Sequence, residues 1–288
     1  MSVTAQPFIE YLQQLERQGE THVHLDEQAT LILREFYKKA KGITDAPVTK
    51  LAPDDEDTSE DSTPTSPEKA AAPAETKPIS VAKGSKAEQI ASLKKQAALY
   101  APVKELGTLR DKLVFSSGDP DADIMLIGEC PGYHDEKAQQ PFSGPAGTKL
   151  DGILKAMGLT RDQVYITYIV KYRPSMENQT TGNRKPTEAE IYENKVFVAQ
   201  EIKVVSPKVI LALGATASQI LLRSKESLDS LRGEFHKPFG IPIRATYPPS
   251  YLLNAEGKSD KRQVWEDMLA TMELLDMPTT EKQKGYFL

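Results

Sequence analysis

Residues 128–147, with the sequence GECPGYHDEKAQQPFSGPAG, are the stretch that decides the fold. An apolar run at 124–127 precedes it, and apolar residues at helical spacing begin at Leu150. The run predicts a buried β-strand and the spacing predicts an α-helix. The glycines and acids between them therefore lie on a loop beyond the carboxyl end of a strand. Open α/β sheets bind their ligands at that position.

Four strand–helix repeats extend outward from this loop. The sequence predicts strands near 122–128, 164–170, 208–213 and 242–247, and helices near 146–157, 188–205, 215–222 and 260–275. Strands that alternate with helices of this length indicate a parallel sheet covered on both faces. We therefore predict an α/β fold of three layers, α/β/α, with a central four-stranded, mainly parallel sheet.

The net charge of the 288-residue chain is −5, but it is unevenly distributed. Residues 54–75 contain eight acids and one lysine, so the remaining residues carry a net charge of +2. No apolar run is long enough to span a bilayer, and the N-terminus lacks the pattern of a signal peptide. The single cysteine, Cys130, excludes an internal disulfide. We expect a cytoplasmic protein without membrane contact.

The loop at 128–147 resembles the first motif of the uracil-DNA glycosylase superfamily, which reads roughly G-E-x-P-G, then acids, then P-F-x-G-x-x-G. The nearest branch is the iron–sulfur, thermostable-type branch. Later motifs of that branch are similar to residues 164–174, 207–214, 232–233 and 247–253, and the resemblance covers about residues 86–276. It implies a DNA glycosylase, which flips a base out of duplex DNA and hydrolyses its N-glycosyl bond. A nucleophilic lysine would cleave the strand through a Schiff base, and the family is similar to hydrolases without one, so we expect an abasic product only.

Residues 1–84 lie outside the repeats. Two short helical patterns within 1–43 predict a small helical N-terminal arm, which either packs on the main domain or a protein partner, or contacts DNA. Residues 44–84 are rich in Pro, Ser, Thr, Ala and acids, and predict an acidic, disordered linker because they bury too little apolar surface. The glycosylase-like domain is then 85–288, opening with a capping box at Ser85.

The cluster ligands of the iron–sulfur branch are missing. The matching positions are Ala101, Lys104, Tyr172 and Asn194. A cluster needs thiolates, so we expect no metal and no cofactor.

Hydrolysis of an N-glycosyl bond develops positive charge on the sugar and negative charge on the base. It requires a carboxylate near the sugar and hydrogen-bond donors near the base. The resemblance implies Glu129 and Asp135 as the catalytic acids, with Glu136 as a further candidate. The alternatives are that Glu129 accepts N–H groups of its own Pro-Gly turn, and that the other two are solvated loop acids.

Four residues are expected to line the base pocket. Phe142 matches the aromatic residue that stacks on the flipped base, although a phenylalanine of the hydrophobic core would give the same sequence pattern. Cys130 is expected to be a small buried residue, because a nucleophilic cysteine would need His134 as its base. Members of the family that recognise uracil carry an asparagine and a histidine at the positions where this chain has Tyr168 and Pro248. Proline offers no donor and tyrosine offers one hydroxyl.

These two changes predict a pocket for a bulkier modified pyrimidine, such as a hydroxymethylated or glucosylated cytosine, whose hydroxyls suit the hydroxyl of Tyr168. Contacts to the DNA backbone are expected from Lys171, Arg173 and Ser250. Tyr251, Leu252 and Leu253 match the loop that wedges into the space left by a flipped base, although a loop end of this kind also occurs in cores.

Three functions of one fold stay open, beside an unrelated cysteine hydrolase. The first is a DNA glycosylase for a modified base, serving antiphage defence or base-excision repair. The second is a catalytically inactive DNA-binding module, and the third is a uracil-DNA glycosylase with a rearranged base reader. A module without activity has no need for two acids beside a stacking ring.

Overall fold

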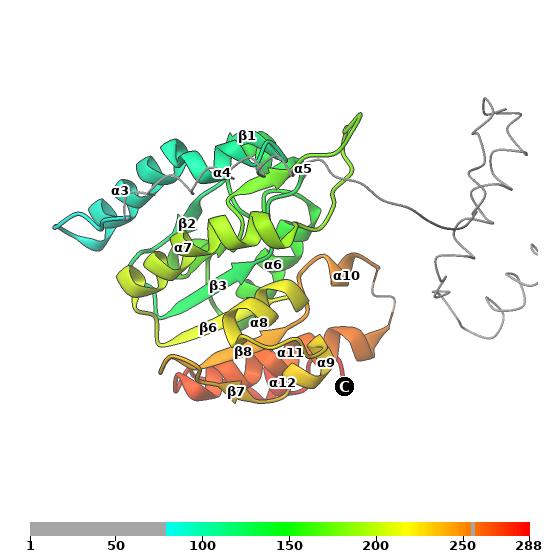
Figure 1. Cartoon of the computed structure of the whole chain (residues 1–288). Coiled ribbons are helices and arrows are strands. Elements are labelled where there is room, and N and C mark those ends of the chain that lie inside the picture. The colour runs from blue at the N-terminus through cyan, green and yellow to red at the C-terminus, as the bar shows by residue number, and fades with distance from the viewer. Residues whose placement is uncertain (1–78, 255–256) are drawn as a thin grey trace, which may run out of the picture. The chain divides into compact units, whose positions relative to one another are not determined.

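The computed structural model describes residues 79–254 and 257–288. The predicted arm, residues 1–43, lies outside these ranges, and the predicted linker enters them only with its last six residues. Figure 1 shows a central sheet with helices on both sides.

Six strands form the central sheet, in the order β2-β4-β3-β6-β8-β7. They are β2 (Ser116–Gly118), β3 (Ile124–Gly128), β4 (Tyr165–Tyr168), β6 (Val209–Leu213), β7 (Phe235–His236) and β8 (Ile243–Thr246). The four inner strands β4, β3, β6 and β8 are parallel, which confirms the predicted core of the sheet. The short edge strands β2 and β7 pair antiparallel and were not predicted. A separate antiparallel pair joins β1 (Leu109–Leu113) to β5 (Tyr172–Pro174).

Alternation along the strands builds the three layers, because successive side chains point to opposite faces of a sheet. Met125 and Ile127 of β3 belong to a core shared with α3 (Lys86–Leu99), α7 (Glu188–Val205) and α8 (Ala215–Leu222). Their neighbours Ile124 and Leu126 belong to a core shared with α6 (Pro145–Met157) and α11 (Lys258–Leu274). Burial on both faces explains why β3 is a continuous apolar run.

Short helices complete the described chain. They are α4 (Ala101–Glu105), α5 (Tyr133–Ala138), α9 (Leu228–Leu231), α10 (Tyr251–Asn254), α12 (Glu281–Lys284) and the 3₁₀ turn η1 (Arg161–Gln163). No helix in the described ranges is both long enough and apolar enough to cross a membrane.

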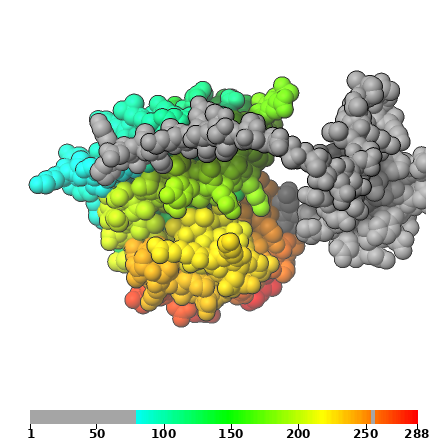
Figure 2. Space-filling model, in the orientation of Figure 1, coloured from blue at the N-terminus to red at the C-terminus, as the bar shows by residue number. Residues whose placement is uncertain are grey.

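The loops that follow β3, β6 and β8 leave the same edge of the sheet, because these strands are parallel. We call this the carboxyl edge. The loop after β5, residues 175–187, is largely exposed, and its tip stands out from the surface in Figure 2 (green, upper right).

The compact domain begins earlier than predicted. Ile79 and Val81 pack against the core on the α3 side of the sheet, and Gln96 of α3 bonds to the backbone of Ser80. The predicted linker boundary at residue 84 is therefore wrong for its last six residues. These residues belong to the domain because their two aliphatic side chains cover apolar surface.

A protein of residues 79–288 is expected to unfold in one cooperative transition. A matched protein of residues 85–288 loses Ile79 and Val81, and its free energy of unfolding should fall by roughly 1–3 kcal/mol, the scale of two partly buried side chains. Denaturant titrations of the two proteins measure the difference. Equal stability would show that the first six residues contribute nothing to the core.

Candidate active site

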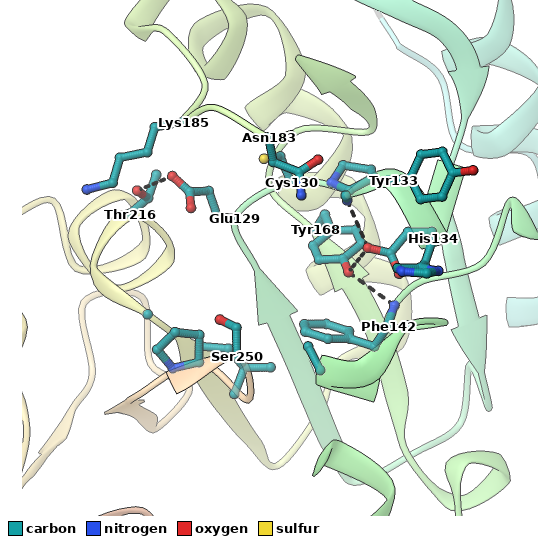
Figure 3. A pocket seen from close by; sticks show the side chains of 18 of the residues that line it. Glu129, Cys130, Tyr133, His134, Phe142, Tyr168, Asn183, Lys185, Thr216 and Ser250 are labelled. Atoms are coloured by element: carbon teal, nitrogen blue, oxygen red, sulfur yellow. Dashed lines mark hydrogen bonds between the residues drawn. The ribbon is translucent and has the colours of Figure 1, made fainter. Parts of the chain in front are cut away.

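A cleft of about 750 Å³ opens at the carboxyl edge of the sheet. We call it the cleft throughout; its walls come from the loops after β3, β5 and β8 and from the start of α8 (Figure 3). It brings together seven of the residues that the sequence singles out, namely Glu129, Cys130, Asp135, Phe142, Tyr168, Pro248 and Ser250.

Glu129 follows directly on β3 and is held by one hydrogen bond. The hydroxyl of Thr216, in the first turn of α8, donates to its Oε1 at 2.7 Å. Within the described part of the chain, Oε2 has no hydrogen-bond partner, and no bond ties this carboxylate to the Pro-Gly turn. One oxygen is thus positioned while the other remains available in the cleft. A carboxylate in this state is suited to stabilise a cationic sugar or to accept a proton from water.

Asp135 lies in the first turn of α5 and is 8% exposed. Its Oδ1 accepts the N–H of Ser143 at 2.7 Å, and its Oδ2 accepts the N–H of Gly132 and the hydroxyl of Tyr168, both at 2.9 Å. These three donors fix the carboxylate to the Pro-Gly turn, to Ser143 and to Tyr168, and one further acceptor site remains on Oδ1. The carboxylate therefore organises the wall of the cleft.

Glu136, the further candidate acid, is paired with two arginines. Its carboxylate contacts Arg173 at 2.8 Å and Arg110 at 2.9 Å. Burial alone would raise the pKa of Glu136, but the two guanidinium groups outweigh burial and hold the pKa below its ordinary value. An ionised, doubly paired carboxylate outside the cleft is structural.

The hydroxyl of Tyr168 is enclosed within the protein. It accepts the N–H of Phe142 at 3.1 Å and donates to Asp135, and burial raises the pKa of Tyr168 well above its ordinary value. The expectation that this hydroxyl pairs with a substituent of the base is therefore wrong. What Tyr168 contributes to the cleft is its ring, whose centroid lies 4.9 Å from that of Phe142 at an angle of 33°.

Two glycines make this aromatic pair possible. A Cβ on Gly128 would lie 2.8 Å from the ring of Tyr168, and a Cβ on Gly147 would lie 1.7 Å from the carbonyl oxygen of Phe142. Phe142 itself has a left-handed φ of 52°. Position 147 therefore requires glycine, because the backbone of Phe142 approaches it too closely for a side chain.

Cys130 is unsuited to covalent chemistry. Burial, and next the negative charge of Glu129, raise the pKa of its thiol well above the ordinary value. The thiolate is the nucleophilic form of cysteine, so Cys130 contributes a small wall of the cleft.

Two predicted phosphate contacts are wrong. The side chain of Lys171 is fully buried and forms an ion pair with Glu201 of α7. Arg173 is 1% exposed and binds Glu136, Asn183 and the carbonyl oxygens of Thr180 and Gly182. Buried cations cannot reach the phosphates of a bound duplex.

The loop after β8 presents one of the three predicted wedge residues, Leu253, to the cleft. Leu252 is buried, whereas Leu253 is 45% exposed and lines the cleft together with the exposed Ser250. Tyr251 stacks on Tyr247 at 4.3 Å and donates its hydroxyl to Asp260 at 2.9 Å, which fixes the loop. Leu253 is therefore the apolar side chain that this loop exposes at the cleft.

The residues of the cleft that were not predicted from the sequence include Thr216 and Asn183. The position of Thr216 could have been predicted, because the rule that ligands bind beyond the carboxyl ends of strands applies to β6 as it does to β3. Asn183 and Lys185 belong to an irregular loop, for which no periodicity exists.

The side chains that the resemblance places at the cluster positions do not fit a metal cluster. The hydroxyl of Tyr172 donates to the carbonyl of Ala97 at 3.0 Å, and the amide of Asn194 binds the backbone of Lys171 and Glu190. No thiolate is available from these side chains. Across the described ranges, no three His, Cys, Asp or Glu residues gather to hold a metal ion.

Comparisons with known proteins agree with this architecture. Residues 115–269 match the family model of the uracil DNA glycosylase superfamily. The chain is 35% identical over 164 residues to the type-4 uracil-DNA glycosylase of Thermotoga maritima, a match that covers 55% of this chain and 81% of that protein. It is 34% identical over 158 residues to the type-4 enzyme of Sulfurisphaera tokodaii, covering 52% and 69% respectively. The chain therefore belongs to the uracil DNA glycosylase superfamily, a family of DNA N-glycosylases.

Proposed function

We propose that this protein is a monofunctional DNA N-glycosylase that hydrolyses the N-glycosyl bond of a flipped nucleotide and leaves an abasic site. The observation that carries the proposal is the carboxylate of Glu129, which has one oxygen held by Thr216 and the other available in the cleft. In this role Glu129 stabilises the cationic sugar and accepts the proton of the attacking water. Phe142 borders the base, while Leu253 fills the space that the base leaves in the duplex.

We further propose that the base is a bulky modified pyrimidine, such as hydroxymethylated or glucosylated cytosine. The asparagine and histidine of uracil readers are replaced here, the hydroxyl of Tyr168 is committed to Asp135 and Phe142, and Pro248 has no donor. The loop after β5 adds the polar side chains of Thr181, Asn183 and Lys185 to the lining of the cleft, and these can bond to a hydroxylated substituent. Some phage genomes carry such bases in bulk, so antiphage defence is a proposed role beside base-excision repair.

The test is an abasic-site assay on duplexes with one uracil, hydroxymethylated cytosine or glucosylated cytosine. Products are analysed with and without alkali. The proposal expects strand breaks on a modified duplex only after alkali. Breaks that appear without alkali would indicate Schiff-base chemistry by a lysine, and Lys185 in the cleft makes this control necessary.

The second candidate is an inactive DNA-binding module. The observation that favours it is that three donors of the cleft wall hold Asp135, which leaves Glu129 as the one acid of the predicted pair with an unbonded carboxylate oxygen in the described part of the chain. The absence of excision from every duplex, together with tight binding to one of them, would support this candidate.

Thr216→Val should lower the excision rate roughly 10- to 100-fold, because a hydrogen bond to a charged group contributes about 1.5–3 kcal/mol. Thr216→Ser retains the hydroxyl and serves as the matched control. A wild-type excision rate in the valine variant would contradict the positioning role of Thr216.

A further inference from the structure

Lys185 brings a positive charge to the cleft. The loop after β5 carries it, and its side chain is exposed (Figure 3). Of the described residues that line the cleft, two carry a permanent positive charge, Arg184 and Lys185. Arg184 is neutralised by Glu190, whose two carboxylate oxygens accept its nitrogens at 2.6 and 2.8 Å. The ammonium of Lys185 has neither an ion pair nor a hydrogen bond within the described ranges.

The backbone of Lys185 is held in place by its neighbours. The guanidinium of Arg184 donates to the carbonyl oxygen of Lys185 at 3.0 Å. It also donates to the carbonyl oxygens of Ser175 and Thr108, at 2.7 and 2.8 Å. Pro186 follows, and its ring disfavours a helical backbone at Lys185. The loop therefore presents the ammonium from a fixed backbone, which lowers the entropy cost of binding an anion there.

Lys185 lies on the side of the cleft that suits the sugar–phosphate backbone of a flipped nucleotide. Figure 3 shows its ammonium toward Glu129 and Thr216, away from the rings of Phe142 and Tyr168. In the proposed function the sugar lies at Glu129 and the base at Phe142. A lone ammonium beside a sugar that becomes cationic would oppose the reaction by like-charge repulsion. A phosphate bound to that ammonium neutralises its charge and removes the repulsion.

A flipped nucleotide brings two phosphates to the cleft, one on each side of its sugar. Ser250, on the loop after β8, is expected at one of them. Lys171 and Arg173, the two cations expected at phosphates, are buried in ion pairs. In the described part of the chain, Lys185 is the unpaired cation that remains at the cleft, and it comes from a different loop than Ser250.

We propose that Lys185 is a phosphate-binding residue, whose ammonium holds one of the two phosphates that flank the flipped nucleotide. The proposal rests on the proposed function and names the cation that holds the backbone of its substrate. The contact is independent of the base, because phosphates carry no sequence information. An ammonium paired with phosphate also stays protonated, and in that form it cannot attack the sugar to form a Schiff base.

The test measures binding of the full chain to a duplex with a tetrahydrofuran abasic analogue, at several salt concentrations. Lys185→Met should weaken binding roughly 3- to 30-fold, a range that extends from an exposed ion pair to a hydrogen bond with a charged group. The slope of log K against log salt should become shallower by about 0.9, the contribution of one phosphate. Lys185→Arg keeps the charge and should bind like the wild type.

Lys203→Met is the matched control. Lys203 is exposed in the last turn of α7, outside the cleft. The helix leads into the amino end of β6, whereas the cleft lies at the carboxyl edge of the sheet. This variant removes the same charge and should leave both the affinity and the salt slope unchanged.

One neutral methylphosphonate, placed in turn on either side of the abasic analogue, locates the contact. At one position it should weaken wild-type binding as Lys185→Met does, and it should leave the binding of Lys185→Met unchanged, because both changes remove the same contact. Losses that multiply at both positions overturn this proposal alone, and so does a wild-type affinity and slope in Lys185→Met. The excision assay tests the proposed function separately, since a coupled phosphate without excision from any duplex overturns the proposed function alone.

Discussion

Glu129→Gln is expected to lower the single-turnover rate of base excision by roughly 10²-fold or more, the scale of a positioned acid–base group. The amide keeps an oxygen for the hydroxyl of Thr216 but can neither accept a proton nor neutralise a cationic sugar. Binding to the same duplex should survive, because the change leaves the walls of the cleft in place. Rapid-quench kinetics and a binding titration measure the two effects separately.

Glu273→Gln is the matched control, since Glu273 is exposed on α11 and lies outside the cleft. It should excise at the wild-type rate. Equal rates for the wild type and Glu129→Gln on a confirmed substrate would remove Glu129 from the mechanism.

Lys171→Met should give the largest loss of stability, about 3–5 kcal/mol in the free energy of unfolding, because it leaves an unpaired charge in the core. Lys171 and Glu201 are both fully buried, and the hydroxyls of Tyr165 and Thr167 also donate to Glu201. Burial raises the pKa of Glu201, an effect that Lys171 opposes. With the lysine gone, Glu201 must either stay charged at high cost or take up a proton.

This loss of stability should depend on pH, because it arises from the buried carboxyl group of Glu201. A carboxyl whose pKa is raised in the folded state destabilises the protein as the pH rises above its unfolded pKa. The deficit of Lys171→Met should therefore be smaller at about pH 5 than at about pH 8. Chemical denaturation at both values measures it, and the double variant Lys171→Met, Glu201→Leu should recover most of the stability. A deficit that is small and independent of pH would contradict the buried ion pair.

The inner sheet was predictable because each of its strands is buried on both faces and so appears as an apolar run. The edge strand β2 has three residues and β7 has two, too few for any alternation to show. The loops that begin where these strands end were predictable as well, because the apolar runs mark the strand ends. Glu129 and Phe142 therefore lie in the cleft as expected, whereas Asn183, from an irregular loop, was missed.

The errors at Lys171 and Arg173 have a common physical origin. Each cation is neutralised by an acid that is distant in sequence, Glu201 for Lys171 and Glu136 for Arg173. Only tertiary packing, of α7 against β4 and of α5 against β5, brings these charges together. From sequence alone, a basic residue near a strand end cannot be distinguished from a phosphate contact, because its acidic partner is not identified.

One measurement tests whether the residues at positions 168 and 248, Tyr168 and Pro248, move the base specificity of the protein away from uracil. Wild-type protein is incubated side by side with uracil-containing, unmodified and hypermodified phage DNA, and abasic sites are counted after equal times. Glu129→Gln supplies the background of the assay. We expect more abasic sites in hypermodified DNA than in uracil DNA, and none above background in unmodified DNA. Equal or greater formation of abasic sites in the uracil DNA would contradict it.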